Sequence, residues 1–98
     1  MTPMEVVDRI KKDVRVNVNR SHIIYYDEVG LVCPPRTEDG VREYSESHVV
    51  DLTIAVLLSD LGVGIADIKR VLHDHDFSVL SDVDKKIELL FERGIKMV

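Results

Sequence analysis

Apolar residues at the start of the chain recur three or four positions apart. Val7, Ile10 and Val14 follow this spacing, which places side chains on one face of a helix. The segment before them, Thr2-Pro3-Met4-Glu5, has the residue types of a capping box, with proline at the first helical position. The pattern predicts a first helix of about three turns.

A different period follows in residues 14–19. Valine alternates there with polar residues, which predicts a short extended link in which Asn17 accepts a left-handed conformation. Asn19 is then a favoured N-cap, and Gly30 is a favoured residue just beyond a helix end. Between Asn19 and Gly30 the sequence predicts a second helix of about ten residues.

Turn residues interrupt the helical pattern after this second helix. The pair Asp39-Gly40 is the strongest short hairpin signal in the chain. Pro34 and Pro35 lie in the incoming arm and lack the amide hydrogen that a central strand needs. The sequence therefore predicts a small, edge-exposed, two-stranded hairpin.

Three further helices are predicted after the hairpin. Ser45 caps the first, whose apolar run over residues 49–61 is the most hydrophobic in the chain and which Gly62 ends, so it is expected to be the core helix. The next is a short helix from about Ile65 to Leu72. The last runs from Ser81 to Gly94, with an apolar stripe of Val83, Ile87, Leu90 and Phe91.

The resulting order is helix, helix, hairpin, helix, helix, helix. This order predicts a mainly α winged helix-turn-helix fold, with a two-stranded β wing and a short C-terminal helix. We expect one domain over residues 1–76, and a C-terminal helix in 77–98 that packs on it or forms an oligomer contact. The chain has 98 residues, 45% apolar and 32% charged, which is typical of one soluble domain and excludes a large enzyme.

Charge is unevenly distributed along the chain. Residues 1–42 hold seven basic and seven acidic side chains, whereas residues 43–98 hold six basic and eleven acidic ones, so the net charge of −5 arises in the second half. The first half is therefore free to present a basic face to DNA. No apolar run is long enough to span a membrane and the N-terminus is unlike a secretory signal, so we expect a cytoplasmic protein.

Little in the sequence predicts metal or catalytic chemistry. His73-Asp74-His75-Asp76 offers metal-ligand types, but its spacing and the absence of a neighbouring cysteine favour a solvated loop. Cys33, the only cysteine, is expected to be a packed or half-exposed thiol. No catalytic motif or phosphate-binding glycine loop is present, so we expect no enzyme, no cofactor and no bound metal.

Several spaced motifs in residues 22–72 carry a family resemblance. They read Tyr25-Tyr26-Asp27-Glu28-Val29-Gly30-Leu31, then Pro35-Arg36-Thr37-Glu38-Asp39-Gly40-Val41-Arg42-Glu43-Tyr44-Ser45, then Leu61-Gly62 and Ile68-Lys69. In these motifs the chain resembles the DNA-binding domain of the MerR (mercury-resistance-regulator) family of bacterial transcription factors. The resemblance implies a DNA-binding transcription regulator of this type, with double-stranded DNA as its partner.

The resemblance also assigns roles to individual residues. The second helix would enter the major groove of DNA, with bases nearest its first turn, Arg20, Ser21 and His22. The phosphate backbone would be contacted by Tyr25 of the second helix, by Arg36 and Arg42 of the wing, and by Lys12 and Arg15 near the first helix. Thr37 of the wing is counted among the DNA-binding residues. Tyr44 is expected to brace the wing on the core and is counted among the DNA-binding residues.

Three departures from the family pattern leave a second hypothesis open. Ile24 stands where the family usually has an arginine, and the link between the first two helices is longer than usual. We also expect neither the long dimerisation helix of the family nor an effector-binding domain. The alternative is a protein-protein interaction module that keeps the scaffold without binding DNA. We expect a compact monomer in solution that pairs weakly or, as a DNA-binding protein, assembles side by side on DNA; another regulatory protein is a further expected partner.

Overall fold

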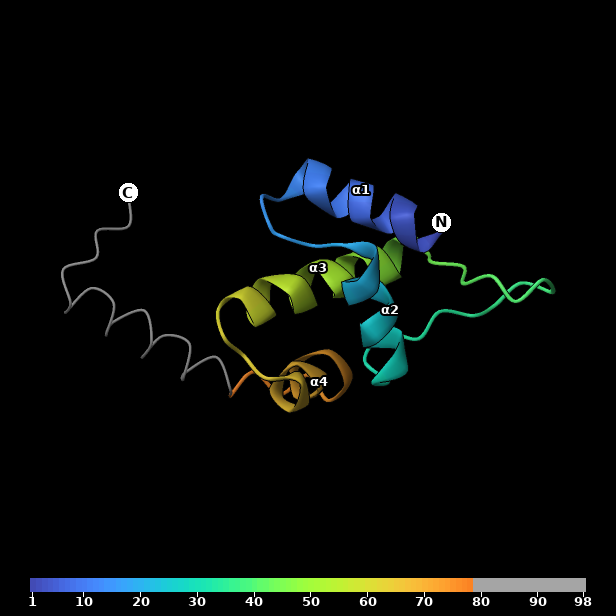
Figure 1. The fold of residues 1–98 in the computed structure, drawn as a ribbon. Helices are drawn as coiled ribbons and strands as arrows, with labels where there is room; N and C mark the ends of the chain where they lie inside the picture. The colour runs from blue at the N-terminus through green and yellow to red at the C-terminus, as the bar shows by residue number, and fades with distance from the viewer. Residues whose placement is uncertain (79–98) are drawn as a thin grey trace.

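A computed structural model describes residues 1–78 of the chain. Within this range it contains four helices, α1 (Pro3–Asp13), α2 (Arg20–Glu28), α3 (Glu46–Asp60) and α4 (Ile65–His73) (Figure 1). The mainly helical architecture and these four predicted helices are thereby confirmed. The helix predicted from Ser81 lies outside the described residues, as does nearly all of the predicted segment 77–98.

The first two helices begin at the predicted caps. In α1 the Thr2 hydroxyl accepts a hydrogen bond from the Glu5 amide at 3.3 Å, and the Glu5 carboxylate accepts one from the Thr2 amide at 3.1 Å. Asn19 caps α2 in the same reciprocal way, with His22 in the place of the glutamate. Each box satisfies amide groups that have no partner inside the helix.

The link between α1 and α2 is extended, as the alternation of its residues predicts. Val18 is fully buried and Val16 packs against the core, so the apolar positions of the link face inward. The left-handed conformation predicted for Asn17 is wrong: among residues 1–78, His75 is the only non-glycine residue with a positive φ. Burial of the alternate valines keeps this segment extended, so that no left-handed residue is needed to turn the chain.

Helix α3 lies at the centre of the fold. Figure 1 shows α1 along one side of α3 and α4 on the other, with α2 beside it and the hairpin projecting away from the helices. Leu52 and Ala55 of α3 are fully buried, as is Ile68 of α4. Not all of the apolar run predicted as core faces inward, because Val50, Leu57 and Leu61 are exposed, Val50 to 58%.

The segment after α2 forms a hairpin, but the predicted two-stranded β wing is not formed within the described residues. One isolated antiparallel bridge joins Arg36 to Arg42, and Gly40 takes the left-handed φ of 79° that the turn requires. Pro34 and Pro35 have no amide hydrogen to donate, so the ladder cannot extend toward the helices. The element is therefore a hairpin with a single bridge.

Further hydrogen bonds hold the two ends of the hairpin segment, Leu31 and Tyr44, to the rest of the fold. The terminal ammonium of Met1 donates to the Tyr44 carbonyl at 2.8 Å, and the Tyr44 amide donates to the Met1 carbonyl at 2.9 Å. His73, at the end of α4, donates from Nε2 to the Leu31 carbonyl at 2.7 Å. The last residue of α4 thus holds the start of the hairpin segment, and the residue that precedes the α1 cap holds its end.

Candidate nucleic-acid interface

Helix α2 has one buried face and one exposed face. Ile23 and Tyr26 are buried in the core, whereas Arg20, Ser21 and Tyr25 are exposed. Ser21 and Tyr25 are four residues apart and lie on the same side of the helix. The first turn of α2 therefore presents polar side chains on a helix whose opposite face is anchored.

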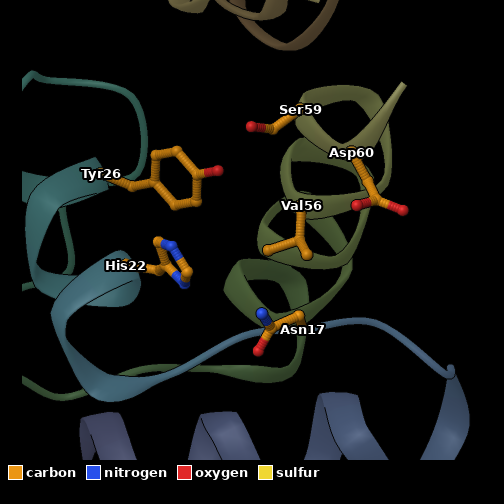
Figure 2. Close-up of a pocket in the computed structure, with 6 residues that line it drawn as sticks. All are labelled: Asn17, His22, Tyr26, Val56, Ser59 and Asp60. Carbon is orange, nitrogen blue, oxygen red and sulfur yellow. The ribbon is translucent and has the colours of Figure 1, made fainter. Parts of the chain in front are cut away.

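His22, the third candidate for base contact, is exposed and also takes part in the α2 cap. Its Nδ1 accepts the Asn19 amide at 3.2 Å, which closes the α2 capping box. The His22 ring and the Tyr26 hydroxyl point from α2 toward α3, across a pocket of about 210 Å³ (Figure 2). The pocket is completed by Asn17, Val56, Ser59 and Asp60. This position serves the helix start and the α2–α3 junction.

The two arginines of the hairpin lie beside α2 and share one carboxylate oxygen. Arg42 donates from Nε to Oδ2 of Asp27 at 2.6 Å, and Arg36 donates from Nη2 to the same oxygen at 3.3 Å. Their side chains differ in exposure, 20% for Arg42 and 49% for Arg36, while that of Asp27 is 12% exposed. The hydrogen bond to Asp27 raises the pKa of the Arg42 guanidinium.

Asp27 is the member of this cluster that the sequence analysis did not single out. It appeared there only as part of the tyrosine-pair motif. The available signal was weak, because an acid in the last turn of a helix is disfavoured by the helix dipole unless a cation meets it. Two arginines after a turn signal could have supplied that cation, but only the folded hairpin brings them to Asp27.

The other two hairpin candidates serve the hairpin itself. The Thr37 hydroxyl accepts the Val41 amide at 3.2 Å, and the Thr37 carbonyl accepts the Gly40 amide at 2.9 Å, so Thr37 closes the turn while remaining exposed. Tyr44 is 2% exposed and lies edge-on to the His48 ring. The DNA contact predicted for Tyr44 needs correction, because its buried side chain is not available to a ligand. Burial also raises the pKa of the Tyr44 phenol.

The remaining basic candidates, Lys12 and Arg15, lie at the end of α1 and in the link, and both are exposed. The neighbouring Arg9 is occupied differently, since it forms a two-bonded fork with Glu46 of α3 at 3.1 Å and contacts Asp13 at 3.6 Å. The structure thus brings the hairpin arginines to α2. It leaves Lys12 and Arg15 as separate solvated cations that precede the first turn of α2 in the chain.

Cys33 and the histidine-rich segment complete the candidates. Cys33 is exposed, its thiol donates to the Asp27 carbonyl at 3.5 Å, and partial burial with the nearby Asp27 raises its pKa. No group of three or more histidine, cysteine or acidic side chains suited to a metal ion is present in residues 1–78. None of the described helices is long and apolar enough to cross a membrane.

Comparisons with known proteins agree with this geometry. A family model described as "MerR HTH family regulatory protein" matches residues 14–75. The mercuric resistance operon regulatory protein of Bacillus cereus is 32% identical over 88 residues, an alignment covering 76% of this chain and 67% of the relative. The HTH-type transcriptional regulator ZntR homolog of Haemophilus influenzae is 30% identical over 77 residues, covering 78% of this chain and 56% of the relative. The chain therefore spans about two thirds and just over half of their lengths.

Proposed function

The chain belongs to the MerR HTH family of regulatory proteins, and we propose that it is a transcriptional regulator that binds double-stranded DNA in a sequence-specific manner. One observation carries the proposal. The hairpin arginine Arg36 lies beside α2, whose first turn is exposed, because Asp27 of α2 forms ion pairs with the hairpin. A helix with a polar first turn can enter the major groove, and a cationic hairpin beside it can contact the phosphate backbone.

Base reading is assigned to Arg20 and Ser21. Both are exposed in the first turn of α2, and neither has a hydrogen bond within the described residues other than those of the helix backbone. An arginine in this place suits the paired acceptors of guanine in the major groove, and a serine hydroxyl can meet either a donor or an acceptor. His22 is assigned to the helix cap instead of to the bases.

Phosphate contact is assigned to exposed groups around that helix. Arg36 offers a guanidinium that is half exposed, Tyr25 offers a hydroxyl on the exposed face of α2, and Lys12 and Arg15 offer flexible cations. Such contacts fix the position of the protein on the duplex and supply most of the affinity, whereas the base contacts supply the preference.

A domain with one recognition helix and one short hairpin makes few contacts with DNA. We therefore propose that useful affinity requires a second copy bound nearby or another regulatory protein on the same DNA. Two linked weak sites gain affinity without any new contact, because the second binding step becomes intramolecular.

The proposal is tested by titrating the protein with a random-sequence duplex at increasing salt, followed by selection from a random pool. We expect the logarithm of the binding constant to fall linearly with the logarithm of salt, with a slope of roughly −0.9 for each phosphate neutralised. We also expect one motif to be enriched. Binding that ignores salt, or a pool without enrichment, would contradict sequence-specific DNA recognition.

One observation favours a second candidate, a protein-binding module on the same scaffold. Val50 and Leu57 on α3, and Leu61 just after it, are exposed apolar side chains, and an exposed apolar patch marks a site of protein contact. The same titration separates the candidates. A protein that shows no affinity for any duplex at low salt would have the scaffold without the DNA function.

A further inference from the structure

The hairpin places two like charges directly opposite each other. Arg36 and Arg42 form the isolated antiparallel bridge, flanked by hydrogen bonds from the Thr37 amide to the Val41 carbonyl and from the Glu43 amide to the Pro35 carbonyl. This arrangement makes them a non-hydrogen-bonded pair, in which side chains leave the same face and lie closest together. Like charges directly opposite destabilise a pair of strands, so an anion between them stabilises this bridge.

Asp27 supplies that anion in the free protein. Its Oδ2 atom is 2.6 Å from Arg42 Nε and 3.3 Å from Arg36 Nη2, and its side chain is 12% exposed. The carboxylate therefore binds the hairpin to α2 at the one point where the hairpin needs negative charge. Among the side-chain contacts within residues 1–78, this carboxylate is the one that joins both hairpin arginines to α2.

The two arginines are held unequally. Arg42 makes the shorter contact and is mostly covered, whereas Arg36 makes a longer contact and is half exposed. Shorter charge-assisted hydrogen bonds are the stronger ones, and covered pairs are less screened by salt. A phosphate approaching from solvent therefore competes for Arg36 more readily than for Arg42.

We propose that Asp27 is a specificity-determining positioning residue, which keeps Arg42 as a fixed strut between hairpin and α2 and releases Arg36 to a DNA phosphate. This inference rests on the proposed DNA-binding function. Asp27 itself touches no base. It acts by fixing where the phosphate contact of Arg36 lies relative to the base contacts of α2, since phosphate contacts set the register in which bases are read.

The first test compares Asp27→Asn with Glu28→Gln. Both remove one negative charge from the end of α2, but Glu28 is exposed and forms no ion pair with either arginine in the described structure. Each variant is titrated with the duplex selected by the wild-type protein and with a scrambled duplex of the same composition. Lost repulsion should raise scrambled-duplex affinity in both variants, and only Asp27→Asn, which frees an arginine for phosphate, should steepen the salt slope by about one.

The ratio of selected to scrambled affinity distinguishes the two variants. We expect it to fall on the order of fivefold in Asp27→Asn, as expected for loss of a well-formed ion pair, and to stay unchanged in Glu28→Gln. Equal ratios in the two variants would overturn the inference and leave the proposed function intact. Failure of the wild-type protein to prefer any duplex would instead overturn the proposed function.

A second test does not require Asp27→Asn to fold. The arginine side-chain Nε–H signals of the wild-type protein are followed by NMR during DNA titration. We expect the Arg42 signal to stay protected from exchange and the Arg36 signal to shift. In parallel, Arg36→Ala should weaken binding to both duplexes, lower their affinity ratio and make the salt slope shallower by about one, whereas Arg42→Ala should lower the ratio and leave the salt slope unchanged. Interchangeable behaviour of the two arginines would refute their division of roles.

Discussion

Replacing Tyr44 with phenylalanine is expected to stabilise the protein. The Tyr44 ring is 2% exposed, and its hydroxyl is the only fully buried side-chain polar atom without a hydrogen-bond partner in the described residues. A buried hydroxyl that loses water without gaining a partner costs about 1–3 kcal/mol. Phenylalanine removes that cost and retains the edge-on contact of the ring with His48.

We expect Tyr44→Phe to gain about 1 kcal/mol in the free energy of unfolding, at the lower end of this range because small relaxations recover part of the penalty. For a domain of this size, about 1 kcal/mol corresponds to a Tm higher by about 4–8 °C. The change is measured by thermal and urea denaturation followed by circular dichroism.

Tyr26→Phe is the matched control. The Tyr26 ring is also buried, but its hydroxyl points into the pocket between α2 and α3, where water can solvate it (Figure 2). Its removal should change stability by less than about 0.5 kcal/mol. A Tyr44→Phe protein that is less stable than wild type would refute the reasoning, because it would mean that the Tyr44 hydroxyl has a partner worth more than its burial costs.

Tyr44→Phe should also change how the free energy of unfolding depends on pH. Burial raises the pKa of Tyr44 above that of an unfolded tyrosine, so the folded state holds the proton more tightly. The stability that comes from keeping the Tyr44 phenol protonated is fully present below about pH 10, the pKa of an unfolded tyrosine, and is lost as pH rises through the folded pKa. Tyr44→Phe should therefore lose less stability than wild type between neutral and strongly alkaline pH, as measured by urea titrations across that range.

Three further outcomes follow from the fold and the interface. Leu52→Ala should cost about 2–5 kcal/mol, seen as a Tm lower by at least about 8 °C, because Leu52 is fully buried in α3; a loss below about 1 kcal/mol would show that the core can close around the gap. Asn19→Ala should cost about 1 kcal/mol in urea denaturation by removing the cap bond to the His22 amide, and an unchanged midpoint would mean that the cap contributes nothing. Arg20→Ala and Ser21→Ala should change the DNA motif recovered by selection, with mismatch costs of about 1–3 kcal/mol, and an unchanged motif would remove α2 from base reading.

The helices were predictable because their signals are local. Thr2 and Asn19 mark helix starts through bonds to residues three positions away, and Gly30 and Gly62 mark ends through their own left-handed backbone. Such signals need no knowledge of the rest of the fold. The one clear local error, the left-handed Asn17, arose because burial of the neighbouring valines outweighed the intrinsic tolerance of asparagine.

The interface was less predictable because its chemistry depends on contacts across the fold. The sequence indicated Arg36 and Arg42 as equivalent cations, whereas the structure gives them unequal bonds to Asp27. Likewise, only folding reveals that the His22 ring serves a helix cap and that Tyr44 is buried. Residue types indicate what a side chain can do, but partners that are distant in sequence decide which of those roles remains open.

The paired backbone bonds between Met1 and Tyr44 have a consequence for the order in which the molecule assembles. They close a loop over a sequence separation of 43 residues, whereas the Arg36–Arg42 bridge spans only six. Because the entropic cost of closing a loop scales as (3/2)RT ln n, closing the 43-residue loop costs ~1.7 kcal/mol more than closing the six-residue one. Helix α2 and the hairpin can therefore form a unit before the N-terminal segment docks on it. We therefore expect the Met1–Tyr44 bonds to form after the α2–hairpin contacts.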